Sequence, residues 1–306
     1  MPITLEYGVP TDKCGLQLLL GIAKGFFREE GLDLSVKVVY GGPEIAAAYD
    51  SGRLKIGELG TPPCLTALSN GHRFKIVGSG VRRGAVQHLV IRPDLEHWKD
   101  LRGRRLAALT IGSCSYWFLR ALLKKHDVDP DKDLEIIGLG DRYPQVVELL
   151  ANGKIDGAVI AEPNVTIAES AGLCCVWVSL ASVDFLPRLQ WTVCVANLDV
   201  IEHEPALVEA VLRGCRRSYR YAAENPEEWV RLGARHFGIS EEIMTRAIER
   251  EIGDLHFDCE IDVDGLKAAI EFQESLGSLA RPIALDDIVD FKFQKLFMEP
   301  ILISPH

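Results

Sequence analysis

The segment at residues 110–115, Thr-Ile-Gly-Ser-Cys-Ser, has the composition of a ligand-binding loop. It joins an expected strand to an expected helix. Gly112 lets the backbone approach a bound molecule, and the free N–H groups of the first helical turn attract an anion by about 0.3–2 kcal/mol. Ser113 and Ser115 add hydroxyl donors, although Ser113 is equally suited to cap the helix, and the two roles are compatible. We therefore predict ligand contacts at Gly112, Ser113 and Ser115.

Two cysteines lie where a thiol could act as a nucleophile. Cys114 falls in the first turn of the same helix, where the pKa of a thiol tends to fall. Cys14 follows Asp12 and Lys13 at the first strand–helix joint. The further candidate ligand contacts of these two segments are therefore Asp12, Lys13, Cys14 and Cys114. Either thiol could attack a substrate, and either could be a small packing residue, so the sequence leaves both roles open.

The other cysteines and the histidines suggest no further chemistry. The chain has eight cysteines, but none forms a Cys-x-x-Cys pair and none has zinc-ligand spacing with histidine. No histidine pairs with Asp and Ser at the spacing of a catalytic triad. We expect no metal, disulfide or cofactor, and we expect buried thiols at Cys174, Cys175, Cys194 and Cys215.

Six more candidate ligand contacts lie in loops or crossings that adjoin expected strands: Gly41, Gly42, Thr61, Arg142, Glu162 and Trp191. Arg142 could grip a carboxylate or sulfonate with its guanidinium, or be a solvent-facing charge. Glu162 could accept a hydrogen bond from an amine or hydroxyl. Trp191 could stack on a flat ligand or belong to the core. The glycine pair permits a close turn, and the threonine offers a hydroxyl.

The composition excludes several classes of partner. The 306 residues include 34 basic and 44 acidic side chains, which gives a formal net charge of −10. No long basic run is present, so we expect neither nucleic acid nor an anionic membrane as partner. No apolar stretch approaches the roughly 18 residues of a membrane helix. The N-terminus has no signal-peptide pattern, so we expect a cytoplasmic protein, or a periplasmic one if a leader was removed.

The elements that must position these residues follow a repeated order. Strand and helix patterns alternate through the first 200 residues, including a helix expected over 15–30. Residues 46–57 and 147–158 share one pattern of a short helix, a glycine stop and a buried strand. Repeated βαβ units form parallel sheets covered by helices. We therefore predict an α/β protein with two similar lobes, followed by mainly helical segments from residue 205 that pack on the first lobe.

Several motifs occur in the order typical of one superfamily: Ala-Lys-Gly-Phe-Phe-Arg-Glu-Glu-Gly-Leu-Asp-Leu at 23–34, Gly-Gly-Pro at 41–43, the stretch 52–63, Asp-Leu-Arg-Gly-Arg-Arg at 100–105, Gly-Lys-Ile-Asp-Gly at 153–157 and Ala-Glu-Asn-Pro-Glu at 223–227. This pattern resembles the substrate-binding proteins of ABC transporters for nitrate, sulfonates and taurine, a superfamily that also contains the thiamine-pyrimidine synthases.

The resemblance implies a type II periplasmic-binding-protein fold, with a mainly parallel sheet in each lobe. Lobe 1 would comprise residues 1–86 and 195–306, and lobe 2 residues 92–190, with hinge crossings at 87–92 and 190–196. A small anionic or aromatic organic molecule would bind in the cleft between the lobes, with an ABC transporter or a sensor protein as partner. Strand ends and helix N-termini are also where physics places ligands in open α/β sheets.

Two kinds of enzyme share the implied fold. Thiamine-pyrimidine synthases carry a lysine and a histidine in the loop after the third strand, but here residues 58–63 contain neither. Aromatic sulfinate desulfinases have a nucleophilic cysteine in the loop after the first strand, and Cys14 is displaced from that position into the helix. The alternative function is therefore a cytoplasmic, cofactor-free lyase of the desulfinase or decarboxylase type, acting through Cys14 or Cys114.

Overall fold

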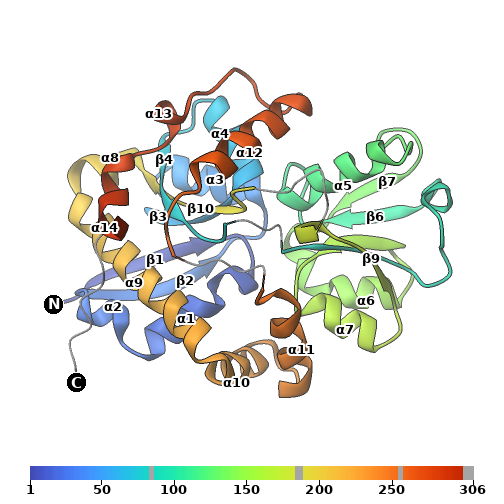
Figure 1. Cartoon of the computed structure of the whole chain (residues 1–306), viewed down its shortest axis with the longest axis horizontal. Helices are drawn as coiled ribbons and strands as arrows, with labels where there is room; N and C mark the ends of the chain where they lie inside the picture. The colour runs from blue at the N-terminus through green and yellow to red at the C-terminus, as the bar shows by residue number, and fades with distance from the viewer. Residues whose placement is uncertain (83–85, 183–188, 254–257, 299–306) are drawn as a thin grey trace.

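The computed structural model describes residues 1–82, 86–182, 189–253 and 258–298. These residues form two lobes, each built on a five-stranded sheet flanked by helices (Figure 1). The first sheet has the order β2-β1-β3-β10-β4, and its strands are β1 Ile3–Val9, β2 Leu32–Val38, β3 Ile56–Gly60, β4 Phe74–Ser79 and β10 Thr192–Asn197. We call this part lobe 1.

The second sheet, in lobe 2, has the order β7-β6-β8-β5-β9. Its strands are β5 His88–Ile91, β6 Arg105–Ala108, β7 Glu135–Gly138, β8 Gly157–Ile160 and β9 Cys175–Ser179. Strand β10 in the first sheet and strand β5 in the second each run antiparallel to both of their neighbours. The other four strands of each sheet share one direction. Both sheets are therefore mainly parallel and have the same topology, which confirms the predicted fold class.

Helices follow the strands in both lobes. Lobe 1 contains α1 Leu16–Ala23, α2 Phe26–Glu29, α3 Gly42–Asp50 and α4 Thr61–Ser69, and lobe 2 contains α5 Cys114–Lys125, α6 Val146–Ala151 and α7 Asn164–Ser170. A 3-10 turn at Asp12–Gly15 precedes α1. The loops that connect strands to helices therefore open at the strand ends, where the candidate site residues lie.

One predicted helix was wrong. The sequence pattern favours a continuous helix over 15–30, but α1 ends at Ala23 and α2 begins at Phe26. Gly25 between them has a φ of 82°, and this left-handed conformation, which glycine adopts without strain, breaks the helical hydrogen-bond series. The apolar spacing continues across the break, so the pattern alone does not reveal it.

The C-terminal helices pack mainly on lobe 1 (Figure 1). They are α8 Leu198–His203, α9 Pro205–Glu224, α10 Pro226–Phe237, α11 Glu241–Glu251, α12 Val263–Ser275, α13 Leu285–Ile288 and α14 Lys295–Met298. Helix α9 lies against α1, and α12 lies against α4. Helix α11 also reaches α7 in lobe 2.

Several contacts join the two lobes, among them a ring stack and a pair of ionic contacts. Phe118 of α5 stacks on Trp191 with a centroid distance of 5.3 Å and on Phe272 of α12 at 5.5 Å. The Nε of Arg250 in α11 lies 3.1 Å from the Oε1 of Glu162, and its Nη2 lies 2.5 Å from the Oε2 of Glu169 in α7. An apolar stack and two ion pairs are therefore among the contacts that hold the two lobes together.

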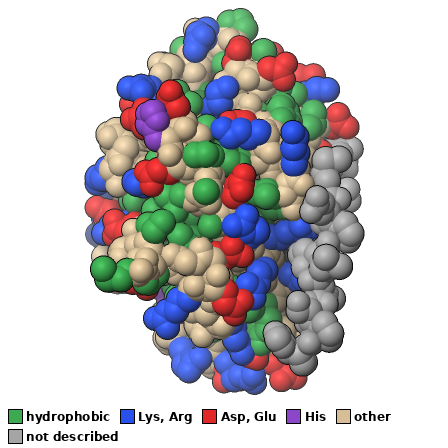
Figure 2. Space-filling view, turned by 90° about the vertical axis from the view of Figure 1, so that its left-hand side faces the viewer, with side chains coloured by type: hydrophobic (Ala, Val, Ile, Leu, Met, Phe, Trp, Pro, Cys, Tyr) green, Lys and Arg blue, Asp and Glu red, His purple; other side chains and the backbone are tan. Residues whose placement is uncertain are grey.

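Acidic and basic side chains are interspersed on the face shown in Figure 2. Along α9, Arg213 pairs with Glu30 at 2.9 Å and Arg217 pairs with Glu29 at 2.7 Å. The short basic run of this helix is therefore matched by acids of α2 and is not a free cationic patch. No helix in the described part of the chain is long and apolar enough to cross a membrane.

Candidate functional site

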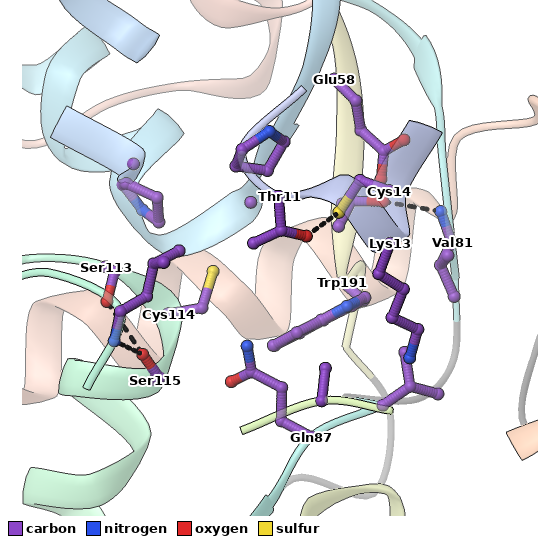
Figure 3. A pocket seen from close by; sticks show the side chains of 18 of the residues that line it. Thr11, Lys13, Cys14, Glu58, Val81, Gln87, Ser113, Cys114, Ser115 and Trp191 are labelled. Atoms are coloured by element: carbon purple, nitrogen blue, oxygen red, sulfur yellow. Dashed lines mark hydrogen bonds between the residues drawn. The ribbon is translucent and has the colours of Figure 1, made fainter. Parts of the chain in front are cut away.

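A cavity lies between the lobes and is lined by the segments that follow the strands of both sheets (Figure 3). Its volume is about 70 Å³, well below the roughly 300–1,000 Å³ of sites for drug-sized molecules. The lining comprises Pro10, Thr11, Lys13, Cys14, Gln17, Gly42, Glu58, Gly60, Pro63, Val81, Val86, Gln87, Leu109, Ser113, Cys114, Ser115, Tyr143, Ala161, Trp191 and Thr192.

The N-terminus of α5 forms one end of the cavity. The Ser113 hydroxyl donates to the Thr110 carbonyl oxygen at 2.6 Å and accepts from the Tyr116 N–H at 3.4 Å, so it caps the helix. The Ser115 hydroxyl oxygen accepts from the Leu109 N–H at 2.8 Å. The hydroxyls thus fix the loop, and Ser113 takes one N–H group of the first turn. The other N–H groups at the start of a helix have no partner within it and can bind an anion.

Lobe 1 supplies a cation on the other side. Lys13 lies in the 3-10 turn after β1 and lines the cavity. Its Nζ forms an ion pair with Glu251 of α11, which is buried. Burial raises the pKa of the Glu251 carboxyl, and Lys13 opposes that shift. The wall on this side of the cavity is therefore polar, but its Lys13 ammonium is already paired with the Glu251 carboxyl.

Glu58 adds a carboxyl that sequence reasoning did not select. It belongs to β3 and lines the cavity at 3% exposure. Burial raises the pKa of this carboxyl to about 7, and hydrogen bonds from Thr192 and Tyr219 oppose the shift. A glutamate inside a strand of otherwise apolar and glycine residues was the available signal, because an acid is seldom buried without a partner.

Two amides and an indole complete the polar lining. Gln17 of α1 is buried at 4% exposure. The Oε1 of Gln87 has no hydrogen-bond partner among the described residues, and its side chain points toward the cavity (Figure 3). Trp191 lines the cavity with its ring stacked on Phe118. The indole is therefore held in place and available to a ligand.

The cavity brings together seven of the predicted ligand contacts: Lys13, Cys14, Gly42, Ser113, Cys114, Ser115 and Trp191. The other six, Asp12, Gly41, Thr61, Gly112, Arg142 and Glu162, lie outside its lining. Arg142 is exposed, and Thr61 is buried with no partner for its hydroxyl among the residues that the structure describes. Asp12 and Glu162 line a neighbouring hollow beside His236. Gly112, with a φ of 83°, shapes the loop that presents α5.

The cysteine chemistry differs from the sequence expectation. Burial raises the pKa of the Cys114 thiol rather than lowering it, because desolvation outweighs the effect of the helix N-terminus. Burial also raises the pKa of Cys14 to about 12, against a hydrogen bond with Thr11 at 3.3 Å. Cys175 is exposed, so its predicted burial was wrong, since it begins β9 at the edge of the second sheet.

Cys114 has a packing role across the cleft. A Cβ placed on Gly60 of lobe 1 would lie 2.2 Å from the Cys114 Sγ. The two lobes therefore approach so closely here that the facing positions accept only small side chains. Among the described residues, no group of three or more His, Cys, Asp or Glu side chains could hold a metal ion.

Comparison with known proteins decides the family. A model described as NMT1/THI5 like matches residues 16–229. The chain belongs to this family. It is 27% identical over 206 residues to the taurine-binding periplasmic protein of Escherichia coli (strain K12), which covers 67% of this chain and 62% of that protein. The chain spans between 47% and 62% of the length of the curated relatives that it matches.

Solved structures share the fold of this NMT1/THI5-like chain. The alkanesulfonate-binding protein SsuA from Xanthomonas axonopodis pv. citri, bound to MOPS, has a TM-score of 0.76 at 15% identity, covering 94% of this chain and 97% of that one. The desulfurization enzyme DSZB has a TM-score of 0.67 at 18% identity, covering 96% and 98%. At these identities both likenesses show only the periplasmic-binding-protein fold, which binding proteins and enzymes share.

Proposed function

We propose that this protein reversibly binds a small organic anion, such as a sulfonate, in the cavity between its lobes. The observation that carries the proposal is the N-terminus of α5, which opens onto the cavity. Helix N-termini attract anions, and the small cavity favours a compact molecule over a large aromatic one. Taurine and alkanesulfonates, named for the relatives, belong to this chemical class.

The ligand would be held between two lobes that hinge. We propose boundaries at residues 1–86 with 195–306 for lobe 1 and 92–190 for lobe 2, with crossings at 87–92 and 190–196. Strand β5 occupies part of the first crossing and β10 part of the second. Each is the reversed strand of its sheet, so the hinge would be anchored in both lobes. An ABC transporter or a sensor protein would be the partner of the closed form.

The binding proposal is tested by ligand identification followed by calorimetry. Native mass spectrometry of the purified protein should show a co-purified small molecule that is released on denaturation. Titration with taurine and propane-1-sulfonate should give micromolar dissociation constants, about −8 kcal/mol, for at least one of them. Absence of heat and of thermal stabilisation with both sulfonates would overturn the proposal.

The rival proposal is a cofactor-free lyase that uses Cys14 or Cys114. Such a nucleophile works as a thiolate, whereas burial raises the pKa of both thiols. The structure of the site therefore favours binding. Turnover of an aromatic sulfinate that is abolished by Cys14→Ala or Cys114→Ala would decide for the enzyme.

A further inference from the structure

Glu58 carries a buried carboxyl, and burying its charged form lowers the stability of the protein unless a partner compensates the charge. It lies in the middle of β3, is 3% exposed, and its strand neighbours are buried. Removing a charged carboxylate from water without a partner is strongly unfavourable. Because the side chain also lines the cavity, whatever compensates the carboxylate can come from a bound molecule.

The protein supplies hydroxyl donors to Glu58 but, among the described residues, no ion pair. The Tyr219 hydroxyl donates to its Oε2 at 3.4 Å. The Thr192 hydroxyl also bonds the carboxyl, and its oxygen accepts the Val81 N–H at 2.8 Å, which leaves its proton for Glu58. The charge of Lys13 also favours the ionised form of Glu58, but the Nζ of Lys13 forms its ion pair with Glu251, so the ion pairs of the described residues do not include Glu58.

We infer that Glu58 is the acceptor for a cationic group of the ligand, so that the bound molecule carries an ammonium as well as an anionic group. This inference rests on the proposed function and names the ligand class of the same site. The anionic end would lie at the α5 N-terminus and the ammonium end at β3, on opposite walls of the cavity (Figure 3). A carboxylate with two donors has acceptor positions left for an ammonium.

The ionisation of Glu58 would then control affinity. Burial raises its pKa to about 7, so the carboxylate that an ammonium requires is present above that pH and lost below it. Among the thiols and phenols that surround it, burial raises the pKa of Cys14 and Cys194 to about 12 and shifts the pKa of the others upward. They therefore stay neutral near pH 7. The titratable and charged neighbours are Tyr7, Lys13, Cys14, Tyr49, Cys194, Cys215, Tyr219 and Cys259.

Two matched ligands test the inference on the full-length protein. In propane-1-sulfonate a methyl group replaces the ammonium of taurine, and taurine remains a zwitterion from pH 6 to pH 8. Calorimetry should show that the wild type prefers taurine at pH 8 by about tenfold or more. Its affinity for taurine should fall about tenfold between pH 8 and pH 6, as a single group with a pKa near 7 requires, whereas affinity for propane-1-sulfonate should not fall.

The variant Glu58→Gln keeps the shape of the side chain and removes its charge. It should lose about tenfold or more in affinity for taurine at pH 8, keep its affinity for propane-1-sulfonate, and bind taurine equally at pH 6 and pH 8. Glu6→Gln, at an exposed position on neighbouring β1, is the control for loss of one acidic charge and should leave both affinities unchanged.

The outcomes separate this inference from the function on which it rests. If the wild type binds both sulfonates equally well at both pH values, the protein is a sulfonate binder and the role of Glu58 is overturned. If the wild type binds neither, the proposed function falls and the inference with it. The pH profile of the wild type decides the matter even if Glu58→Gln does not fold.

Discussion

The thiols of Cys14 and Cys114 both lie in the cavity wall, and both are governed by burial rather than by their position in the chain. Burial raises the pKa of Cys14 to about 12 and shifts that of Cys114 in the same direction. Cys175, by contrast, is exposed at the edge of lobe 2. At the residue scale, the reactive-looking cysteines of the sequence are therefore packing residues, and the exposed one is accessible to reagents.

Alkylation distinguishes these cysteines. With iodoacetamide at pH 8, Cys14 and Cys114 should react at least about 100-fold more slowly than Cys175, because the thiolate is the reacting species. Peptide mapping by mass spectrometry gives the order of modification. All eight cysteines should react in guanidinium, as a control for reagent access. Modification of Cys14 before Cys175 would contradict the assignment.

Glu58 makes stability depend on pH. Its pKa is raised from 4.5 to about 7 in the folded protein by burial. The unfolded chain therefore releases this proton at lower pH than the folded protein does, and stability is lost as the pH rises through that interval. Glu58→Gln avoids this loss. Between pH 4.5 and pH 8 the free energy of unfolding of the wild type should therefore fall by about 3 kcal/mol relative to that of Glu58→Gln.

Urea denaturation of the ligand-free protein at the two pH values measures the effect. Glu6→Gln serves as the control, since that side chain is exposed. An equal difference between Glu58→Gln and wild type at both pH values would show that the buried carboxyl does not titrate in this interval.

At the scale of the element, α5 connects fold and function through its first turn. Ser113 is 1% exposed, and its hydroxyl bonds both the loop before the helix and the N–H of Tyr116. The same turn forms the anion-binding end of the cavity. A cap at this place therefore does two things, because it stabilises the helix and it fixes the backbone that would meet a ligand.

Two capping serines separate these contributions. Ser113→Ala should cost about 1 kcal/mol of stability and also weaken sulfonate binding. Ser240→Ala removes a comparable cap from α11, where the hydroxyl accepts from the Ile243 N–H at 3.2 Å away from the cavity, and should cost similar stability without changing affinity. Thermal unfolding and calorimetry give the two quantities. Equal affinities in both variants would remove the α5 loop from the site.

The sequence predicts elements better than it predicts the cavity wall. Ser113 was identified as a cap because its type and position suit one end of an apolar helical pattern. Gly25 was missed because the apolar spacing continues through the break. Glu58, Gln17 and Gln87 were missed because their neighbours in the cavity come from distant segments. Strand alternation locates a residue on one side of a sheet, but it does not say which polar atoms remain without partners there.

At the scale of the whole molecule, the contact between Gly60 and Cys114 sets how closely the lobes approach. Among the described glycines of the cavity wall, Gly60 leaves the least space for a Cβ, which would lie 2.2 Å from the Cys114 Sγ of the other lobe. A Cβ on Gly42 would lie 2.4 Å from the Pro63 side chain, which belongs to the same lobe. The Phe118–Trp191 stack and the Arg250 ion pairs also join the lobes.

Substitution at this contact should hold the lobes apart. Gly60→Ala is compatible with the backbone, which has φ −64° and ψ 138°, but its methyl group would collide with the Cys114 Sγ. We expect a larger radius of gyration in small-angle scattering and about tenfold weaker sulfonate binding. Adding Cys114→Ala should restore both, because it removes the sulfur.

Gly253→Ala is the control, since a Cβ there meets open space. If the double variant behaves like Gly60→Ala alone, the effect of the methyl group does not come from the contact between lobes.

The reversed strand β10 also has a consequence for biosynthesis. Lobe 1 needs β10 between β3 and β4, yet that strand is made only after every strand of lobe 2. During translation the second sheet can therefore be completed while the first still exposes two unsatisfied strand edges, which are prone to pair with other chains. The nascent protein would depend on chaperones for as long as residues 192–197 remain inside the ribosome.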